Sequence, residues 1–310
     1  MTTAPLPDAR PDNWVDRYAP PPARPWLKLA RFDRPIGTWL LMLPGWQAVG
    51  MASAEQGKGP DIGLLVLIAI GALVMRGAGC AYNDIVDRDY DAKVARTAMR
   101  PIPAGQISVK GAWAYVVALS LVGLLILLLL KPLAIALGVG SLLLVAAYPF
   151  MKRITWWPQA WLGLTFNWGA PLGYAAATGH FGWQAVLLYA SGFFWTLGYD
   201  TIYALQDMED DALVGVKSSA RRLGANAPQG VAVFYAICVL LTGAAAVVAG
   251  LGPFFWPFLV IYALHFVWQA RALRVEDGSL ALKLFKSNRD AGLILFLGMI
   301  AGSWRLGLLG

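Results

Sequence analysis

The stretch LGANAPQGVAVFYAICVLLTGAAAVVAGLGPFFWPFLVIYALHFVWQA, residues 223–270, contains no Asp, Glu, Lys or Arg. Residues 154–199 are also free of these four residue types. An α-helix of about 18 to 20 apolar residues spans a bilayer, so each stretch is long enough for two spans. The sequence therefore predicts an all-α, polytopic membrane protein.

The overall composition supports this prediction. The chain has 310 residues, of which 58% are hydrophobic and 14% are charged, and its mean hydropathy is +0.57. Soluble domains contain about 25% charged residues, so this chain has too few polar side chains to cover a surface in water. Its two cysteines, Cys80 and Cys238, exclude a disulfide framework and a thiolate metal cluster.

The chain is predicted to have two parts. Residues 1–25 are rich in proline and lack an apolar run, which predicts a disordered cytoplasmic tail without a cleavable signal peptide. Residues 26–310 are predicted to form a single transmembrane domain, beginning with a surface helix at residues 26–34. We expect nine transmembrane helices, at residues 36–53, 62–82, 112–130, 132–150, 158–177, 183–205, 229–249, 252–270 and 288–308.

Lys and Arg residues in the loops set the predicted orientation, because cytoplasmic loops carry an excess of both. With the N-terminus inside, only Lys58, Lys131 and Arg305 fall on the opposite side, and Arg76 lies within a span. We therefore expect a multi-pass protein of the bacterial-type inner membrane. Its N-terminus would be cytoplasmic, and nine spans would place its C-terminus on the opposite side.

Two loops repeat one pattern of charges. Residues 83–91 read NDIVDRDYD and residues 206–211 read QDMEDD, each at the predicted cytoplasmic end of a span. Three cations follow each acidic cluster: Lys93, Arg96 and Arg100 after the first, and Lys217, Arg221 and Arg222 after the second. Such clusters are also typical of solvated loops, but independent loops have no reason to repeat both spacing and order. The repeat predicts two four-helix halves facing each other, with a ninth helix added.

The residue types of these clusters favour metal and diphosphate. In a helix, Asn83, Asp87 and Asp91 share one face, as do Asp207 and Asp211. Oxygen ligands without His or Cys select a hard ion, and Mg²⁺ binds through carboxylates together with substrate phosphates. An EF-hand is excluded because the loop spacing does not fit. A phosphatidyl-alcohol transferase would have one aspartate cluster instead of two.

Several motifs resemble the UbiA-type intramembrane aromatic prenyltransferases. They are the aspartates of residues 83–91, the run Arg96-Thr-x-x-Arg100-Pro-x-Pro-x-Gly105, and Tyr199-Asp-Thr-x-Tyr-Ala-x-Gln-Asp207-x-Glu-Asp-Asp211-x-x-x-Gly-Val-Lys-Ser218. With Arg31-Phe-Asp-Arg-Pro-Ile-Gly37 and Pro149-Phe-Met-Lys-Arg153, the last run looks most like the 4-hydroxybenzoate polyprenyltransferases of ubiquinone biosynthesis. The resemblance covers about residues 26–305.

This resemblance implies nine helices around a central cavity, in a bilayer, without a nucleic-acid or obligate protein partner. It implies Mg²⁺-dependent transfer from polyprenyl diphosphate to the ring carbon ortho to the hydroxyl of 4-hydroxybenzoate. It assigns one Mg²⁺ to Asn83, Asp87 and Asp91, and the other to Asp207 and Asp211. It also makes five cations candidates for contacts with the diphosphate: Arg96, Arg100, Lys152, Arg153 and Lys217.

Two charges inside predicted spans are further candidates, because intramembrane charges mark functional sites. Arg76 precedes Asn83 by seven residues and would lie about 10 Å deeper on the same face. We expect Arg76 to bind the carboxylate of 4-hydroxybenzoate, with Arg34 as the competing candidate and an Arg76–Asp200 ion pair as the alternative. Asp200, on the face of Asp207, is a candidate for stabilising the allylic cation or accepting the ring proton.

Two alternatives to this function stay open at this point. An ion-coupled transporter would also carry charges such as Arg76 and Asp200 within its spans. Against it, the charges gather at one face of the predicted bilayer instead of crossing it. Among prenyltransferases, the acceptor could instead be dihydroxynaphthoate, haem, homogentisate or chlorophyllide.

Overall fold

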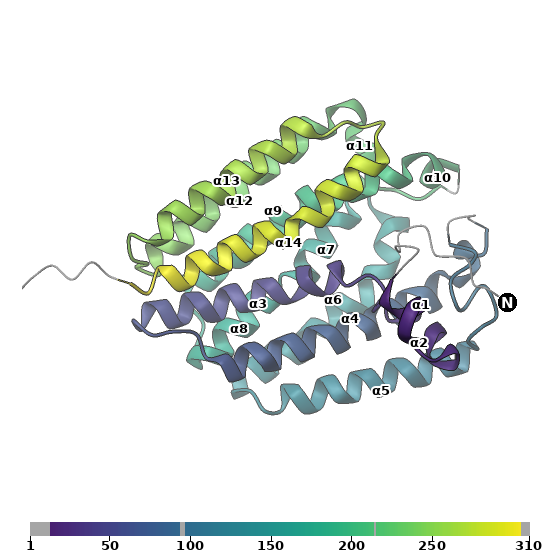
Figure 1. The fold of residues 1–310 in the computed structure, drawn as a ribbon, viewed down its shortest axis with the longest axis horizontal. Coiled ribbons are helices and arrows are strands. Elements are labelled where there is room, and N and C mark those ends of the chain that lie inside the picture. The colour runs from purple at the N-terminus through teal and green to yellow at the C-terminus, as the bar shows by residue number, and fades with distance from the viewer. Residues whose placement is uncertain (1–12, 94–96, 214, 305–310) are drawn as a thin grey trace, which may run out of the picture. The chain divides into compact units, whose positions relative to one another are not determined.

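The structure, a computed structural model, describes residues 13–93, 97–213 and 215–304. Residues 1–12 of the predicted tail and the predicted diphosphate ligand Arg96 lie outside these ranges. The described residues form helices and connecting turns, with no β-strand among them (Figure 1). The all-α prediction is confirmed.

Fourteen α-helices and three 3₁₀ turns make up the described parts of the chain. The α-helices are α1 (Trp14–Tyr18), α2 (Arg24–Leu29), α3 (Ile36–Glu55), α4 (Ile62–Asp91), α5 (Val109–Leu127), α6 (Pro132–Ile154), α7 (Pro158–Phe166), α8 (Gly169–Thr178), α9 (Trp183–Ala204), α10 (Met208–Leu213), α11 (Ser219–Leu223), α12 (Ala227–Val248), α13 (Phe255–Ala272) and α14 (Gly278–Ala301). The 3₁₀ turns are η1 (Pro21–Ala23), η2 (Leu205–Asp207) and η3 (Gly224–Asn226).

The predicted spans match these helices with three main differences. The second predicted span, residues 62–82, continues to Asp91 as α4, so the first aspartate motif lies within this helix. The fifth predicted span, residues 158–177, is two helices, α7 and α8. Pro171 in the first turn of α8 has no N–H to donate to the carbonyl of Asn167, so a continuous helix would lose that bond. The ninth helix, α14, begins ten residues before the predicted residue 288, because Asp277 caps its N-terminus by accepting a hydrogen bond from the backbone N–H of Leu280 at 2.8 Å.

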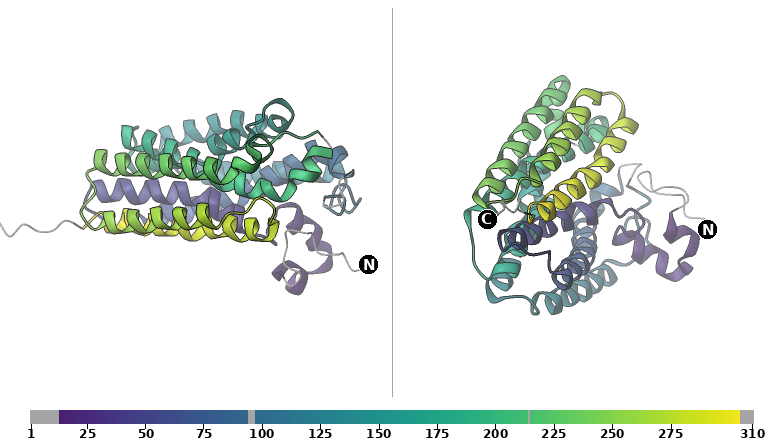
Figure 2. Two further views of the ribbon diagram at one scale, coloured as in Figure 1. Left: turned by 90° about the horizontal axis from the view of Figure 1, so that it is seen from above. Right: turned by 60° about the vertical axis from the view of Figure 1, so that its left-hand side comes forward.

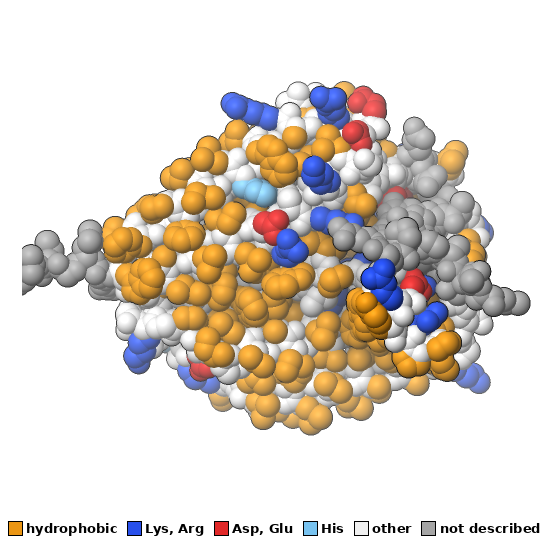
Figure 3. Space-filling model, in the orientation of Figure 1, with side chains coloured by type: hydrophobic (Ala, Val, Ile, Leu, Met, Phe, Trp, Pro, Cys, Tyr) orange, Lys and Arg blue, Asp and Glu red, His pale blue; other side chains and the backbone are white. Residues whose placement is uncertain are grey.

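The outward-facing side chains support a membrane environment. Large apolar side chains are strongly exposed on several helices, for example Leu125, Leu143 and Leu240. Figure 3 shows hydrophobic side chains over most of the face on which α13 and α14 lie. Within the described residues, four segments are long and apolar enough to cross a membrane: Ile62–Asp91, Val109–Leu127, Pro132–Ile154 and Ser219–Val248. The number of nine spans stays a prediction.

Contacts divide the chain into two compact units. Unit 1 comprises Met1–Trp39 and Ala69–Leu129, and unit 2 comprises Leu40–Ile68 and Leu130–Gly310. This division differs from the predicted single domain and from the predicted four-helix halves, because α6 and most of α3 belong to unit 2. Each aspartate motif belongs to a different unit.

The N-terminal segment of unit 1 is more ordered than predicted. The side chain of Asn13 caps α1 by accepting a hydrogen bond from the backbone N–H of Asp16 at 3.1 Å. Lys28 Nζ in α2 lies 2.7 Å from Asp16 Oδ1, and Val15 is fully buried. The predicted disordered tail is therefore wrong for residues 13–25, because a cap, an ion pair and an apolar anchor fix them.

A small apolar core supports the first aspartate motif in unit 1. Ala81 and Ile85 of α4 pack against Leu29 at the end of α2 and against Ile102 and Ile107 of the loop that follows α4. The loop is thus folded onto the helix that precedes it. This packing brings the part of the loop that contains Arg100 close to the motif.

Unit 2 contains closely packed helices around α9. Figure 2 shows α12, α13 and α14 side by side in both views. A Cβ on Gly198 of α9 would lie 2.3 Å from the ring of Tyr235 of α12, so only glycine permits this approach. Tyr235 donates a hydrogen bond to Gln269 at 2.7 Å, and Trp195 donates to Asn288 at 2.8 Å. Buried polar pairs therefore tie α9, α12, α13 and α14 together.

Candidate functional site

The first aspartate motif occupies the last two turns of α4. The side chain of Asn83 donates from Nδ2 to Asp87 Oδ2 at 3.0 Å. Asp87 and Asp91 are both buried. Since a buried carboxylate is costly unless it is paired, these side chains need positive partners or a cation. The structure confirms that the motif is helical and brings Asn83 and Asp87 together.

Asp84, which the sequence did not indicate as a site residue, contacts two arginines. Arg31 Nη2 lies 2.7 Å from Asp84 Oδ1 and 2.9 Å from Oδ2. Arg100 Nη1 lies 3.3 Å from Asp84 Oδ1 and 2.7 Å from Asp91 Oδ2. The one available signal was the position of Asp84 beside Asn83. The charge pattern alone did not separate this residue from the solvated acids.

The loop after α4 is tied to the end of that helix. Thr97 Oγ1 donates to the carbonyl of Asp91 at 2.8 Å, and the backbone N–H of Arg100 donates to the carbonyl of Thr97 at 2.9 Å. These bonds turn the chain back on itself. They explain how Arg100, nine residues after Asp91, reaches its carboxylate.

Arg34 and Arg76, the two candidates for the acceptor carboxylate, have different surroundings in unit 1. Arg34 lies beside Asp33, with Nη2 3.3 Å from Asp33 Oδ2. The guanidinium of Arg76 packs against Gly37 in the first turn of α3, where a Cβ would lie 2.5 Å from Nε. Arg34 thus contacts a neighbouring carboxylate, and the guanidinium of Arg76 packs closely against Gly37.

The second aspartate motif follows α9 in unit 2. It is not one continuous α-helix, because the 3₁₀ turn η2 separates α9 from α10. A 3₁₀ turn advances by about 120° per residue instead of 100°, so Asp200 and Asp207 lie about 40° apart around the helix axis, compared with about 20° in the other direction for an uninterrupted α-helix. The prediction that Asp200 and Asp207 share a face stays a prediction. Asp200, Asp207 and Asp211 are all partly buried.

Backbone contacts bring two predicted diphosphate ligands of unit 2 together. Lys152, in the last turn of α6, accepts a backbone hydrogen bond from Lys217 at 3.1 Å. Lys217 Nζ donates to the carbonyl of Ile154 at 3.2 Å. Arg153 is exposed, and its guanidinium lies 5.8 Å from the ring centre of Phe150. The end of α6 and the loop after the second motif therefore form one cationic region.

Arg221 closes the loop that follows the second motif. Its Nη1 donates to the carbonyl of Asp211 at 3.3 Å and to that of Val216. Its guanidinium lies 5.4 Å from the ring centre of Trp156. The main role of Arg221 is thus to hold this loop.

The fit of Mg²⁺ depends on the oxygen donors present. No group of three or more His, Cys, Asp or Glu in the described parts of the chain is arranged to hold a metal ion. The first motif still offers adjacent donors, since Asn83 bonds Asp87 and leaves its carbonyl oxygen for a cation. Asp91 is the third donor and is engaged by Arg100. This set suits a hard divalent ion once Arg100 releases Asp91.

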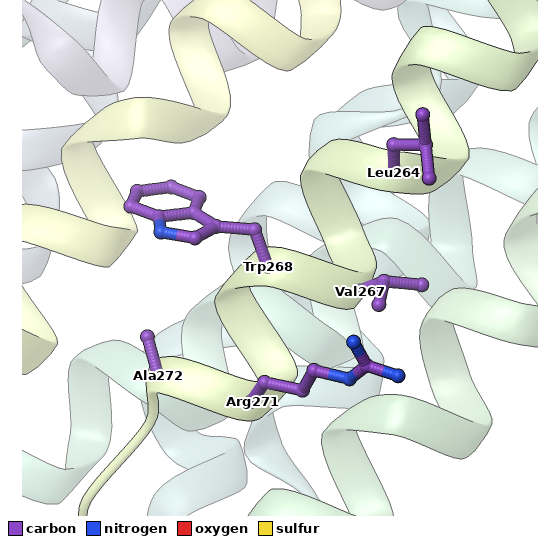
Figure 4. A pocket seen from close by; sticks show the side chains of 5 residues that line it. All are labelled: Leu264, Val267, Trp268, Arg271 and Ala272. Carbon is purple, nitrogen blue, oxygen red and sulfur yellow. The ribbon is translucent and has the colours of Figure 1, made fainter.

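A groove of about 490 Å³ lies on the surface of α13. Five residues of that helix line it: Leu264, Val267, Trp268, Arg271 and Ala272 (Figure 4). It contains no carboxylate and three strongly exposed apolar side chains. The groove is therefore an outward-facing surface feature and not the candidate metal site.

Comparisons with known proteins agree with this chemistry. The UbiA prenyltransferase family model matches residues 43–300. The chain is 47% identical to a mitochondrial 4-hydroxybenzoate polyprenyltransferase of Homo sapiens, over 93% of this chain and 78% of that protein. It is 43% identical to the corresponding Arabidopsis thaliana protein, over 94% of this chain and 71% of that protein.

Solved structures share the fold. The apo structure of a UbiA homologue from Aeropyrum pernix K1 has a TM-score of 0.71 at 27% identity, and covers 84% of this chain and 96% of its own. A UbiA homologue from Archaeoglobus fulgidus bound to GPP and Mg²⁺ has a TM-score of 0.64 at 20% identity, over 90% of this chain and 98% of its own. The overall helical arrangement is thus that of a known fold.

Proposed function

The chain belongs to the UbiA prenyltransferase family, and we infer that it transfers a polyprenyl chain from polyprenyl diphosphate to 4-hydroxybenzoate. The new carbon–carbon bond forms ortho to the hydroxyl, with release of diphosphate and of the ring proton. Such a product serves ubiquinone biosynthesis. The observation that carries this inference is the identity of 47% to a 4-hydroxybenzoate polyprenyltransferase over 93% of the chain.

The residues of the two motifs fit the first half of this reaction. Asn83, Asp87 and Asp91 would hold one Mg²⁺, and Asp207 and Asp211 the other. The bound metal would neutralise the leaving diphosphate and so favour ionisation of the allylic carbon–oxygen bond. The candidates for diphosphate contacts are Arg100, Lys152, Arg153 and Lys217, together with Arg96.

The acceptor requires a different set of residues. Arg76 would bind the carboxylate of 4-hydroxybenzoate, because it is a partly buried cation within a predicted span and its guanidinium packs against Gly37. Arg34, whose Nη2 lies 3.3 Å from Asp33 Oδ2, stays the competing candidate. Asp200 would stabilise the allylic cation or take the ring proton. The alternative, an Arg76–Asp200 ion pair, stays a prediction.

The enzyme is proposed to span its membrane nine times around a central cavity, with the N-terminus on the cytoplasmic side. The relatives are named mitochondrial proteins. They support a membrane protein but not the bacterial-type inner membrane that the sequence suggested. An ion-coupled transporter is not favoured, because the family and these relatives are prenyltransferases.

Release of diphosphate by the purified protein tests the function. We expect release only when a polyprenyl diphosphate, 4-hydroxybenzoate and Mg²⁺ are all present. Asp87→Asn and Asp207→Asn should each reduce it by at least about a hundredfold. Arg222→Gln, a change at a cation to which no role is assigned, is the matched control. Release without 4-hydroxybenzoate at the full rate would contradict the inference.

A further inference from the structure

Asp84 is a buried acid whose two oxygens are both engaged by arginine. Its side chain is 1% exposed. Arg31 Nη2 contacts both oxygens, at 2.7 and 2.9 Å, and Arg100 Nη1 lies 3.3 Å from Oδ1. Removing a carboxylate from water is expensive and is tolerated only with such pairing. With both oxygens engaged, Asp84 differs from its neighbours Asn83 and Asp87, which contact each other.

The backbone of Arg31 is strained, and its pairing with Asp84 compensates. Its φ is +59°, a left-handed conformation that is unfavourable for a residue with a Cβ. Arg31 Nη1 also donates to the carbonyl of Lys28 at 3.1 Å. Burial alone would lower the pKa of Arg31, but the nearby negative charge of Asp84 raises it above its usual value. Strained residues with such support cluster at functional sites.

Arg100 is shared between two acids of the same helix. Asp84 and Asp91 are seven residues apart in α4 and therefore lie on one face, two turns apart. Arg100 Nη1 is 3.3 Å from the first and 2.7 Å from the second. The shorter contact is with Asp91, a proposed metal ligand. A cation can bind Asp91 only if Arg100 gives up that contact.

We propose that Asp84 is a positioning residue that retains Arg100 beside the first aspartate motif when Mg²⁺ takes Asp91. Before metal binds, Arg100 is the counter-ion of Asp91. After metal binds, Asp84 keeps the guanidinium within reach of the diphosphate, which becomes its new partner. This inference rests on the proposed function, since it requires Asp91 as a metal ligand and a diphosphate substrate.

Because Arg100 and the metal would compete for Asp91, two substitutions should have opposite effects on the affinity for metal. In Arg100→Gln, no guanidinium competes for Asp91, so Mn²⁺ alone should bind about tenfold more tightly. In Asp84→Asn, Arg100 has Asp91 as its remaining acidic partner, so Mn²⁺ should bind about tenfold more weakly. Tenfold corresponds to the coupling expected within one salt-bridge network.

The double variant separates positioning from direct coordination. If Asp84 acts through Arg100, Asp84→Asn should not change Mn²⁺ affinity in the Arg100→Gln background. If Asp84 coordinates the metal itself, the loss should be equal in both backgrounds, which would overturn the proposal. The dissociation constant for Mn²⁺ is measured from the signal of the free ion by electron paramagnetic resonance. Arg88→Gln, at an exposed cation of the same helix, is the matched control and should leave the affinity unchanged.

A second measurement tests the proposal without the Asp84→Asn variant, in case that variant does not fold. A thiolodiphosphate analogue of the prenyl substrate should tighten Mn²⁺ binding in the unsubstituted protein, because it supplies a new partner for Arg100. In Arg100→Gln this enhancement should fall about tenfold, and an equal enhancement would overturn the proposal. The dissociation constant for Mn²⁺ can be measured in this complex because the assay does not depend on turnover. If the protein turns over normally but the effects of Asp84→Asn and Arg100→Gln on Mn²⁺ affinity are additive, only the inference about Asp84 is refuted. If there is no turnover, the proposed function is refuted.

Discussion

Gly37→Ala tests the role of Arg76 without changing any charge. A Cβ on Gly37 would lie 2.5 Å from Arg76 Nε and 2.8 Å from Nη2, whereas ordinary contacts begin at 3.4 Å. The guanidinium must therefore move by about 1 Å. Because it is the far end of a flexible side chain, it can move without a shift of the backbone. The substitution thus displaces Arg76 and leaves the helices in place.

The expected effect on the acceptor is large and that on stability is small. A hydrogen bond between charged groups contributes about 1.5 to 3 kcal/mol, and each 1.4 kcal/mol corresponds to about tenfold in affinity. If Arg76 binds the carboxylate of 4-hydroxybenzoate, Gly37→Ala should raise KM for this substrate by about tenfold or more. Alanine is favoured over glycine in a helix by about 1 kcal/mol, which offsets the cost of the displacement.

The assay is steady-state turnover with 4-hydroxybenzoate varied at saturating polyprenyl diphosphate, together with the melting temperature. Gly71→Ala is the matched control, since its Cβ would meet only Ile126, at 3.8 Å. Arg76→Lys should resemble Gly37→Ala. If neither variant changes KM for 4-hydroxybenzoate, Arg76 does not bind its carboxylate, and Arg34 becomes the candidate.

Three further predictions concern other parts of the chain. Burial favours a higher pKa for Asp16, but hydrogen bonds with Lys28 and Asn13 lower it below the usual 3.8; the protection of residues 13–19 against amide exchange, relative to the intrinsic rate at each pH, should therefore fall as the pH falls below about 4, and Asp16→Asn should remove this pH dependence. Lys217→Gln should raise KM for polyprenyl diphosphate by about tenfold through loss of a charged contact, and an equal rise for 4-hydroxybenzoate would contradict this role. Asp200→Asn should lower kcat by about a hundredfold at unchanged KM, and a normal kcat in a folded protein would exclude it from the chemistry.

The helical architecture was predictable because apolar runs determine it. The start of α4 at residue 62 and of α9 at residue 183 follows directly from the hydropathy of the sequence. The break between α7 and α8 was missed, because a helix interrupted by Pro171 is as apolar as a continuous one. The 3₁₀ turn η2 was missed for a similar reason, since no residue type enforces it.

The candidate site was predictable in its residue types but not in its pairing. Spacing placed Asn83 beside Asp87, and the structure confirms their contact. The pairing of Asp84 with Arg31 depends on how the segment before α3 folds against α4. Residues 53 positions apart meet only through tertiary packing, and no local pattern specifies that contact.

The mass of the product formed by the purified protein tests the central claim most directly. With Mg²⁺, 4-hydroxybenzoate and a polyprenyl diphosphate, we expect a single product whose mass equals both substrates minus diphosphate. Fragmentation should place the polyprenyl group on the ring carbon ortho to the hydroxyl. A free prenyl alcohol as the sole product, or a prenyl group attached through the carboxylate, would contradict the claim.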